Sequence, residues 1–263
     1  MGGKEPRTLG TVETACDVID ALVDLERAGV TELANYLDMS KGSAYNHLAT
    51  LRKRELVVKD GDKYTLSHLF FNYGMYTRNR SALYNAAKPE LEELASSVGE
   101  YAHLMVEEFG RGIYLVKEQG KKGIPDEYHV EKFEARDPLH VSSTGKAILA
   151  HLPESRVEEI IESRGLPRYT ENTITDADAL FDELAETRER GYGINDEEEI
   201  RGVRAVGAPI LDSDGDILGS ISVSGPSSRI KGEDFHEHIP EQVVGAANVI
   251  EISLETGQMQ PQL

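Results

Sequence analysis

The strongest constraint on the fold lies in residues 11–66, where helical periodicity appears three times and is followed by a hairpin pattern. Residues 11–28 predict a first helix, and Gly29 is expected to end it. Thr31 is predicted to cap a second, short helix. The predicted apolar stripe of the first helix is Val12, Ala15, Ile19, Leu22 and Val23.

A third helix is predicted from Ser40, its expected cap, to residue 55, with an inner stripe of Ala44, Leu48 and Leu51. Two short strands at 56–59 and 63–66 then flank Asp60-Gly61-Asp62, and Asp-Gly is a strong hairpin signal. Helix, short helix, helix and hairpin in this order are typical of a winged helix-turn-helix. We therefore predict such a DNA-binding domain over residues 8–68.

The third helix ends in the basic run at 52–54, the longest in the chain, and its first turns carry groups that can contact phosphates or base edges. The predicted hairpin adds two lysines near its tip. A small helical domain that does not bind DNA is the alternative. The predicted DNA-binding residues are Lys41, Ser43, Tyr45, Asn46, His47, Arg52, Lys59 and Lys63.

The charge balance at first argues against a nucleic-acid partner, because 47 Asp and Glu oppose 28 Lys and Arg. The acidic residues are concentrated elsewhere: residues 1–75 hold 9 basic and 11 acidic residues, whereas residues 76–263 hold 19 and 36. Such acidity can serve solubility alone. The absence of Trp and the presence of only 12 Lys favour a second explanation, a halophile with a cytoplasm at very high salt concentration.

Residues 67–98 are predicted to be helical, with a new start at Pro89, so that residues 69–90 form a connecting helix. Leu69, Phe70, Tyr73 and Tyr76 make an aromatic stripe on it. Such a stripe is typical of a packing surface. We expect it to pair protomers in a homodimer or homotetramer.

From residue 101 the pattern alternates between strands and helices, which predicts an α+β domain with a mainly antiparallel sheet over residues 91–257. Hairpins are expected at 109–111 and 212–215, and a helix is expected from Thr144. Thr175 is predicted to begin a helix that Gly191 ends. The stripe predicted for the last helix is Val243, Ala247, Ile250 and Leu254.

A candidate ligand site lies where residues 142–145 open a helix, since a helix start offers unpaired N–H groups and a positive dipole end. Gly145 is expected to let a ligand approach the backbone closely. In the strand near 220–224, alternate serines share one face. From the residues alone, that face suits either a hydrogen-bonding pocket floor or solvent.

The order of four segments, 142–153, 165–175, 189–210 and 220–229, resembles the IclR family of transcriptional regulators, with similarity over about residues 9–257. The resemblance implies a GAF-like effector-binding domain, a dimer or dimer of dimers, and binding to a palindromic site on double-stranded DNA. It also implies a small-molecule effector, often a carboxylic acid or an aromatic compound.

Within this resemblance, Ser143, Thr144, Ser222 and Ser224 match positions that line the effector pocket. Asn195 stands where members often have Asp, and Ala205 where a member that senses glyoxylate and pyruvate has Cys. The change to Asn removes a negative charge and adds donors, which suits a more anionic or a more hydroxylated ligand, such as a sugar acid. On the third helix, Asn46 stands where members often have Arg. Arg typically contacts guanine and Asn typically contacts adenine, so an adenine contact is expected at this position. The predicted effector-binding residues are Ser143, Thr144, Gly145, Asn195, Ala205, Ser222 and Ser224.

No catalytic motif is found: the sequence lacks G-x-S-x-G, a P-loop and GxGxxG, so we predict that the chain is not an enzyme and needs no cofactor. His236 and His238 lack an evident third metal ligand, so no metal site is predicted. A metal- or metabolite-sensing protein that does not act on DNA is the alternative function. With a lone Cys16, no signal peptide and no membrane-length apolar run, we predict a cytoplasmic protein without membrane contact.

Overall fold

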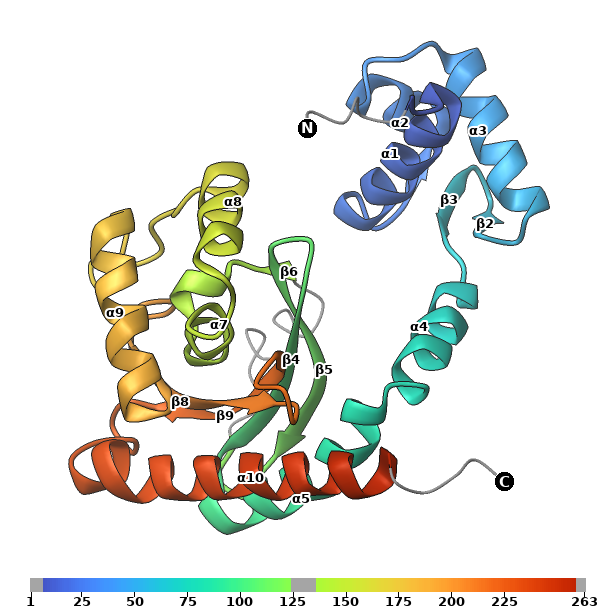
Figure 1. Ribbon diagram of the computed structural model, residues 1–263. Helices are drawn as coiled ribbons and strands as arrows, with labels where there is room; N and C mark the ends of the chain where they lie inside the picture. The colour runs from blue at the N-terminus through green and yellow to red at the C-terminus, as the bar shows by residue number, and fades with distance from the viewer. Residues whose placement is uncertain (1–6, 124–135, 259–263) are drawn as a thin grey trace. The chain divides into compact units, whose positions relative to one another are not determined.

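The computed structural model describes residues 7–123 and 136–258. The chain divides into two compact units, Met1–Arg78 and Asn79–Leu263. The first is helical with a small sheet, and the second has helices on both faces of a larger sheet (Figure 1). The predicted α+β class, with an N-terminal helix-turn-helix and a mainly antiparallel C-terminal sheet, is confirmed.

The first unit has the predicted order of elements, including the wing. Its small antiparallel sheet runs in the order β1-β3-β2, and Gly61 takes the positive φ of 58° that the hairpin turn requires. The elements are α1 (Gly10–Asp24), β1 (Ala28–Gly29), α2 (Val30–Tyr36), α3 (Lys41–Lys53), β2 (Val57–Asp60), β3 (Lys63–Leu66) and α4 (Leu69–Asn79).

The stripe predicted for α1 is partly wrong. Val12 and Val23 are 57% and 60% exposed, whereas Val18, Ala21 and Leu22 are buried. The spacing from 18 to 22 is that of a helix face, and the core of this unit forms between this face and the buried residues of α2 and α3. The helical periodicity of α1 was therefore predicted correctly, but the predicted buried face included residues that face solvent.

Of the helix starts predicted at Thr31, Ser40 and Pro89, only that at Ser40 is found in the structure. Ser40 caps α3 as predicted, because its Oγ accepts from the Ser43 N–H at 3.1 Å. Thr31 does not cap α2: that helix begins one residue earlier, and the Gly29 N–H donates to Glu32 Oε2 at 2.8 Å. The helical region after the wing breaks at residues 80–81, where Ser81 Oγ accepts from the Tyr84 N–H at 3.2 Å.

The predicted start at Pro89 is therefore wrong, and residues 69–90 do not form one connecting helix. Pro89 lies inside α5 (Ala82–Val98). A helix can begin at Ser81 because its hydroxyl satisfies an otherwise unpaired N–H.

The second unit is built on a six-stranded antiparallel sheet in the order β6-β5-β4-β9-β8-β7. The predicted hairpins at 109–111 and 212–215 connect β4 to β5 and β8 to β9. At its centre, β4 pairs with β9, which is distant in sequence. The strands are β4 (Tyr101–Glu108), β5 (Arg111–Gln119), β6 (Arg136–Asp137), β7 (Gly193–Asp196), β8 (Val203–Leu211) and β9 (Ile217–Pro226).

Helices cover both faces of this sheet (Figure 1). On one face lie α7 (Ser143–Leu149), α8 (Glu154–Arg164) and α9 (Ala177–Arg190); on the other lie α5 and α10 (Ile239–Gln258). The stripe predicted for the last helix is confirmed, since all four residues are buried in the α10 core. The short helices are η1 (Leu139–Val141) and the π-helical η2 (Asp234–His238).

The predicted cap of α9 is off by one residue. Asp176 Oδ1 accepts from the Ala179 N–H at 3.0 Å, whereas Thr175 Oγ1 instead accepts from Arg168. Gly191 ends α9 as predicted, with a left-handed φ of 82°. Within residues 7–123 and 136–258, no helix is both long and apolar enough to cross a membrane.

Candidate DNA-binding surface and ligand cavity

The exposed face of α3 follows from its buried face. Ala44, Leu48 and Leu51 pack into the core, so Lys41, Tyr45, Asn46 and Arg52 lie on the solvent side. Ser43 and His47 are half-buried at the edges of this face. The predicted contacts on α3 therefore include both exposed and partly covered side chains.

The two wing lysines differ in how available their charges are. Lys59 is exposed, with its Nζ 5.7 Å from the centroid of the Tyr64 ring. Lys63 Nζ lies 3.3 Å from Glu32 Oε1, and the Gly29 N–H and this lysine lower the pKa of Glu32. Part of the charge of Lys63 is thereby balanced within the domain, so Lys59 is the stronger candidate for a phosphate contact.

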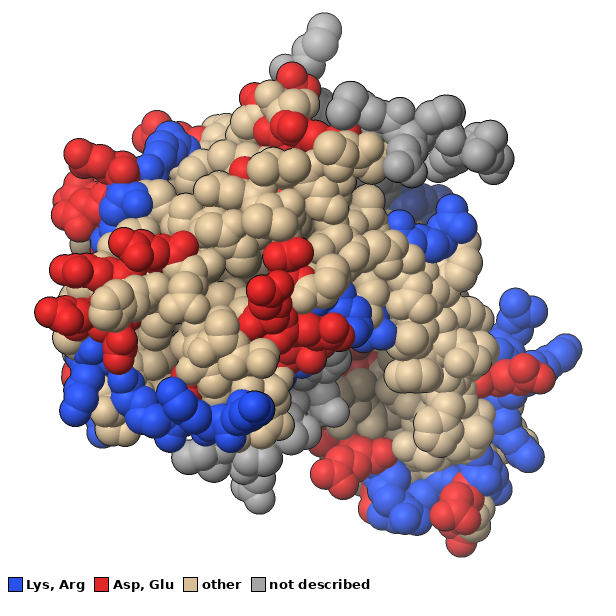
Figure 2. Space-filling model, turned by 90° about the horizontal axis from the view of Figure 1, so that it is seen from below, with Lys and Arg blue, Asp and Glu red and all other residues tan. Residues whose placement is uncertain are grey.

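The charged side chains are mixed on the molecular surface. On the face drawn in Figure 2, Asp and Glu form several patches, with Lys and Arg beside them. The net charge of the chain is −19. General attraction to phosphate is weak for such a protein, so we expect α3 to depend on direct contacts in a groove.

In the second unit, α7 lies unusually close to the sheet because two facing residues are glycines. A Cβ on Gly193 would lie 2.4 Å from Ser143 O, and one on Gly207 would lie 2.8 Å from Ser143 C. Ser142 Oγ caps the helix by accepting from the Gly145 N–H at 3.0 Å. The first turn of α7 is thus fixed directly above β7 and β8.

A small enclosed cavity lies beneath this turn, with free space of about 10 Å³, room for about one water molecule. Six of the seven predicted effector-binding residues line it: Ser143, Thr144, Asn195, Ala205, Ser222 and Ser224. A ligand larger than water requires its walls to move apart.

Gly145, the seventh, does not line the cavity. A Cβ at this position would lie 2.0 Å from Leu139 O, so the glycine is needed for packing against the preceding turn. Its N–H is also occupied by Ser142. The expectation that Gly145 admits a ligand is therefore corrected: its role in this structure is to seat α7.

The serines of β9 do not face water. Ser220, Ser222 and Ser224 are 0%, 3% and 6% exposed, and Ser220 Oγ donates to Thr144 O at 2.9 Å. The hydroxyls of Ser222, Ser224 and Ser143 make no hydrogen bond among the described residues. These buried hydroxyls can therefore form hydrogen bonds with a ligand or a water molecule in the cavity.

Ser142, which belongs to the predicted 142–145 segment but was not among the seven residues, also lines the cavity. Sequence reasoning missed four lining residues: His103, Tyr114, Glu199 and Val203. The ring of His103 lies 5.4 Å from that of Tyr114, and its strand pairs His103 with Ser222. The alternation of side chains along β4 could have assigned His103 to one face of the sheet. Only the pairing of β4 with β9 places it beside Ser222.

A buried ion network supports α7 from the side of α9. Lys146, 1% exposed, has its Nζ 2.6 Å from Glu198 Oε1 and 3.4 Å from Glu183 Oε1. Arg190 Nη2 lies 2.6 Å from the same oxygen of Glu183. Burial raises the pKa of Glu198 more than Lys146 lowers it, whereas at Glu183 the two cations outweigh burial and the pKa falls.

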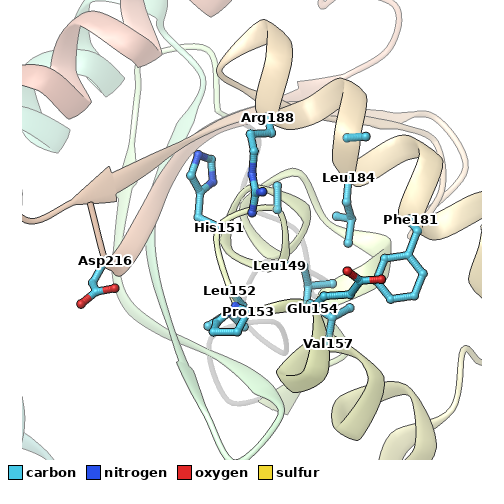
Figure 3. Close-up of a pocket in the computed structure, with 12 residues that line it drawn as sticks. Leu149, His151, Leu152, Pro153, Glu154, Val157, Phe181, Leu184, Arg188 and Asp216 are labelled. Carbon is cyan, nitrogen blue, oxygen red and sulfur yellow. The ribbon is translucent and has the colours of Figure 1, made fainter. Parts of the chain in front are cut away.

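A larger hollow of about 550 Å³ lies between α8 and α9 (Figure 3). Leu149, Val157, Phe181 and Leu184 line it together with Arg188. None of the seven predicted effector-binding residues belongs to it. Its lining mixes these apolar side chains with His151, Glu154 and Asp216, and it lacks the convergent unpaired hydroxyls of the cavity under α7.

Within the described part of the chain, no three His, Cys, Asp or Glu side chains converge as a metal site would require. His238 Nδ1 lies 3.1 Å from Asp234 Oδ1, an exposed pair within the η2 segment, which raises the pKa of His238.

A winged helix-turn-helix followed by a sheet domain with a buried polar cavity is typical of a DNA-binding transcriptional regulator. Residues 11–61 match the "IclR helix-turn-helix domain", and residues 76–252 match "Bacterial transcriptional regulator IclR C-terminal". The chain belongs to the IclR family of transcriptional regulators.

Individual regulators are also similar to this chain over most of its length. The Halobacterium salinarum protein named "Probable HTH-type transcriptional regulator ArcR" is 39% identical over 96% of both chains. The Escherichia coli regulator KdgR is 29% identical over 90% of this chain and 89% of its own. The Thermotoga maritima IclR structure, 28% identical, superposes with a TM-score of 0.72 over 94% of this chain and 99% of its own.

Proposed function

We propose that this regulator binds promoter DNA through α3 and the wing, and that a small organic or sugar acid bound under α7 controls this binding. The observation that carries the proposal is the set of buried hydroxyls of Ser143, Ser222 and Ser224, which have no partner among the described residues. Buried polar groups are rarely left without a hydrogen bond, so a ligand or water is expected there. A homologue of the same fold, from Microbacterium hydrocarbonoxydans, was solved as a complex with 4-hydroxybenzoate.

A carboxylate suits the start of α7. The N–H groups of Ser143 and Thr144 lie in the first turn and have no partner among the described residues, whereas that of Gly145 is used by Ser142. Unpaired N–H groups and the helix dipole both favour an anion at this position. The hydroxyls of Ser222 and Ser224 then serve its other oxygens. Control of DNA binding requires that the ligand favours one of two states of the protein.

Ser222→Ala is expected to weaken effector binding while leaving promoter affinity unchanged. Loss of one hydrogen bond to a neutral group costs about 0.5–1.5 kcal/mol, and about 1.5–3 kcal/mol if the group is charged. Titration calorimetry with keto acids and sugar acids measures the effect. Ser253→Ala, an exposed serine of α10, is the matched control. Equal affinities in the two variants would place the ligand outside this cavity.

On the DNA side, we propose that Lys41, Arg52, Lys59 and Lys63 contact phosphates, and that Ser43, Tyr45, Asn46 and His47 read base edges in the major groove. A palindromic site then follows from a two-fold symmetric dimer. The protein is proposed to work in the cytoplasm, at the high salt concentration that its acidic surface suits.

Asn46→Ala is expected to lower affinity for the specific promoter site by about 1–3 kcal/mol, because an Asn side chain can bind adenine through two hydrogen bonds. Fluorescence anisotropy in molar salt, with promoter fragments recovered by chromatin immunoprecipitation, measures this affinity. Lys231→Ala, an exposed substitution in the second unit, is the control. If Asn46→Ala binds the specific site as tightly as the control does, Asn46 does not read a base.

We further propose a homodimer or homotetramer formed partly through α4. Of the predicted stripe, Tyr73 and Tyr76 are 53% and 64% exposed, whereas Leu69 and Phe70 are half-buried; Phe71, outside that stripe, is 66% exposed. Large apolar groups gathered on one short helix are typical of a protein contact. Light scattering at micromolar concentration in the protein's native salt is expected to give at least twice the chain mass of 29.0 kDa. A monomer under these conditions would overturn the proposal.

A further inference from the structure

A hollow of about 440 Å³ lies between α2, α3 and the wing, within the first unit. Its lining includes Tyr45 from α3 and both wing lysines, Lys59 and Lys63. The same lining holds two carboxylates, those of Glu32 and Asp62. Proteins that bind DNA usually present positive charge to it, so a carboxylate at this position opposes binding.

The hollow separates the two elements that are proposed to contact DNA. A duplex that touches both α3 and the wing passes over it, and phosphates of one strand then come close to Lys59 and Lys63. We propose that Glu32 restrains DNA affinity by holding Lys63 in the free protein and releasing it only when a phosphate takes the place of the carboxylate. This inference rests on the DNA-binding function proposed above.

Both carboxylate oxygens of Glu32 are engaged. Oε1 lies 3.3 Å from Lys63 Nζ, and Oε2 accepts from the Gly29 N–H at 2.8 Å. The bond to Gly29 ties the carboxylate to the start of α2, so Glu32 does not follow Lys63 when the lysine turns to DNA. The carboxylate therefore stays in the hollow, where it repels an approaching phosphate.

The ion pair is nevertheless easy to exchange. The side chains of Lys63 and Glu32 are 42% and 55% exposed, and exposed ion pairs contribute little to stability. Asp62 is exposed and forms no ion pair within the described chain, so it does not compete for the lysine. Lys59, whose Nζ lies over the Tyr64 ring, has no carboxylate to leave.

The exchange limits how steeply DNA affinity falls with salt. When Lys63 contacts a phosphate, about one counterion leaves the DNA. The carboxylate of Glu32 has then lost its ammonium partner and attracts a cation from solution. Release and uptake offset each other, so Lys63 adds little salt dependence while Glu32 is charged.

The test is the affinity of full-length Glu32→Gln for promoter fragments recovered by chromatin immunoprecipitation, measured by fluorescence anisotropy over a series of KCl concentrations. Glutamine keeps an oxygen that can accept from the Gly29 N–H but carries no charge. This variant is expected to bind about threefold more tightly than wild type. Its plot of log K against log salt is expected to be steeper by about 0.9, the value for one phosphate contact.

Two further variants separate the exchange from a general effect of charge. Glu13→Gln removes one exposed carboxylate of α1 that does not line the hollow, and it is expected to bind as wild type does. Lys63→Gln alone is expected to change the salt slope little. Added to Glu32→Gln, it is expected to remove the extra slope and most of the gain in affinity.

The outcomes also separate this inference from the proposed function. If Glu32→Gln binds no more tightly than Glu13→Gln, or if its gain is unchanged when Lys63→Gln is added, the restraint is wrong. The DNA-binding function stands in either case as long as Asn46→Ala weakens binding. If wild type and every variant bind the promoter fragments no better than unrelated DNA of the same length, both ideas fail.

Discussion

Lys146→Met is expected to destabilise the second unit by about 3–5 kcal/mol, the range found when one partner of a buried ion pair is removed. Met fills a similar volume, so the loss reflects charge rather than packing. Without Nζ, Glu198 keeps a buried carboxylate, one oxygen of which already has no hydrogen-bond partner among the described residues. Urea denaturation in the protein's native salt measures the free energy of unfolding.

The same variant predicts a pH dependence with a definite sign. In wild type the pKa of Glu198 is raised, with burial as the largest cause, and removing Lys146 raises it further. A raised folded-state pKa means that the carboxylate destabilises the fold as pH rises from the unfolded pKa through the folded one. The deficit of Lys146→Met is therefore expected to be largest at neutral pH and to shrink in acid.

Lys88→Met is the matched control, because Lys88 pairs with Glu92 on the surface of α5 and half of its side chain is exposed. Surface pairs contribute little to stability, so this variant should unfold nearly as wild type does. If the two methionine variants have the same stability at neutral pH, the buried network is not what holds α7.

Gly145→Ala is expected to destabilise the second unit by about 3 kcal/mol or more, at the upper end of overpacking effects, because the new methyl group overlaps backbone rather than a flexible side chain. The Cβ would lie 2.0 Å from Leu139 O, so the preceding turn or α7 must move. Circular dichroism during thermal unfolding, together with effector calorimetry, measures stability and the cavity separately. Both are expected to be impaired.

Gly245→Ala makes the same change inside α10, where a Cβ has no neighbour within 4 Å. Because alanine favours helices over glycine, this variant is expected to gain about 0.5–1 kcal/mol. The two substitutions are therefore expected to have opposite signs. A mild, equal effect of both would show that α7 can shift on the sheet without cost.

Local chemistry made much of the fold predictable. Ser40 before an apolar stripe, Asp60-Gly61 between two strand patterns and Gly191 at a helix end are decided by nearby atoms, and all three are found as predicted. Where several residues could do the same job, the choice was wrong by a residue or a face. Asp176 rather than Thr175 caps α9, and Val18 rather than Val12 faces the core.

The burial of the residues around the cavity could not be predicted from local sequence patterns. The periodicity of β9 grouped Ser222 with Ser224 on one side, but either side of a strand can face solvent. Only the packing of α7 on that face, made possible by Gly193 and Gly207, buries the serines. The resemblance to the IclR family implied a pocket role for Ser222 and Ser224, whereas the separate local argument for Gly145 did not include its contact with Leu139 O.

By itself, the sequence determined the winged helix-turn-helix, the α+β class of the second unit and the family, because these depend on periodicity, turn residues and short motifs. The tertiary structure decided which charges the cavity holds. Lys146 is next to Gly145 in sequence but turns to Glu198, whereas Glu199, distant in sequence, reaches the cavity beside Asn195. The reason is that strand pairing and the packing of α7 on the sheet bring together side chains that are distant in sequence. Local sequence patterns do not predict such contacts.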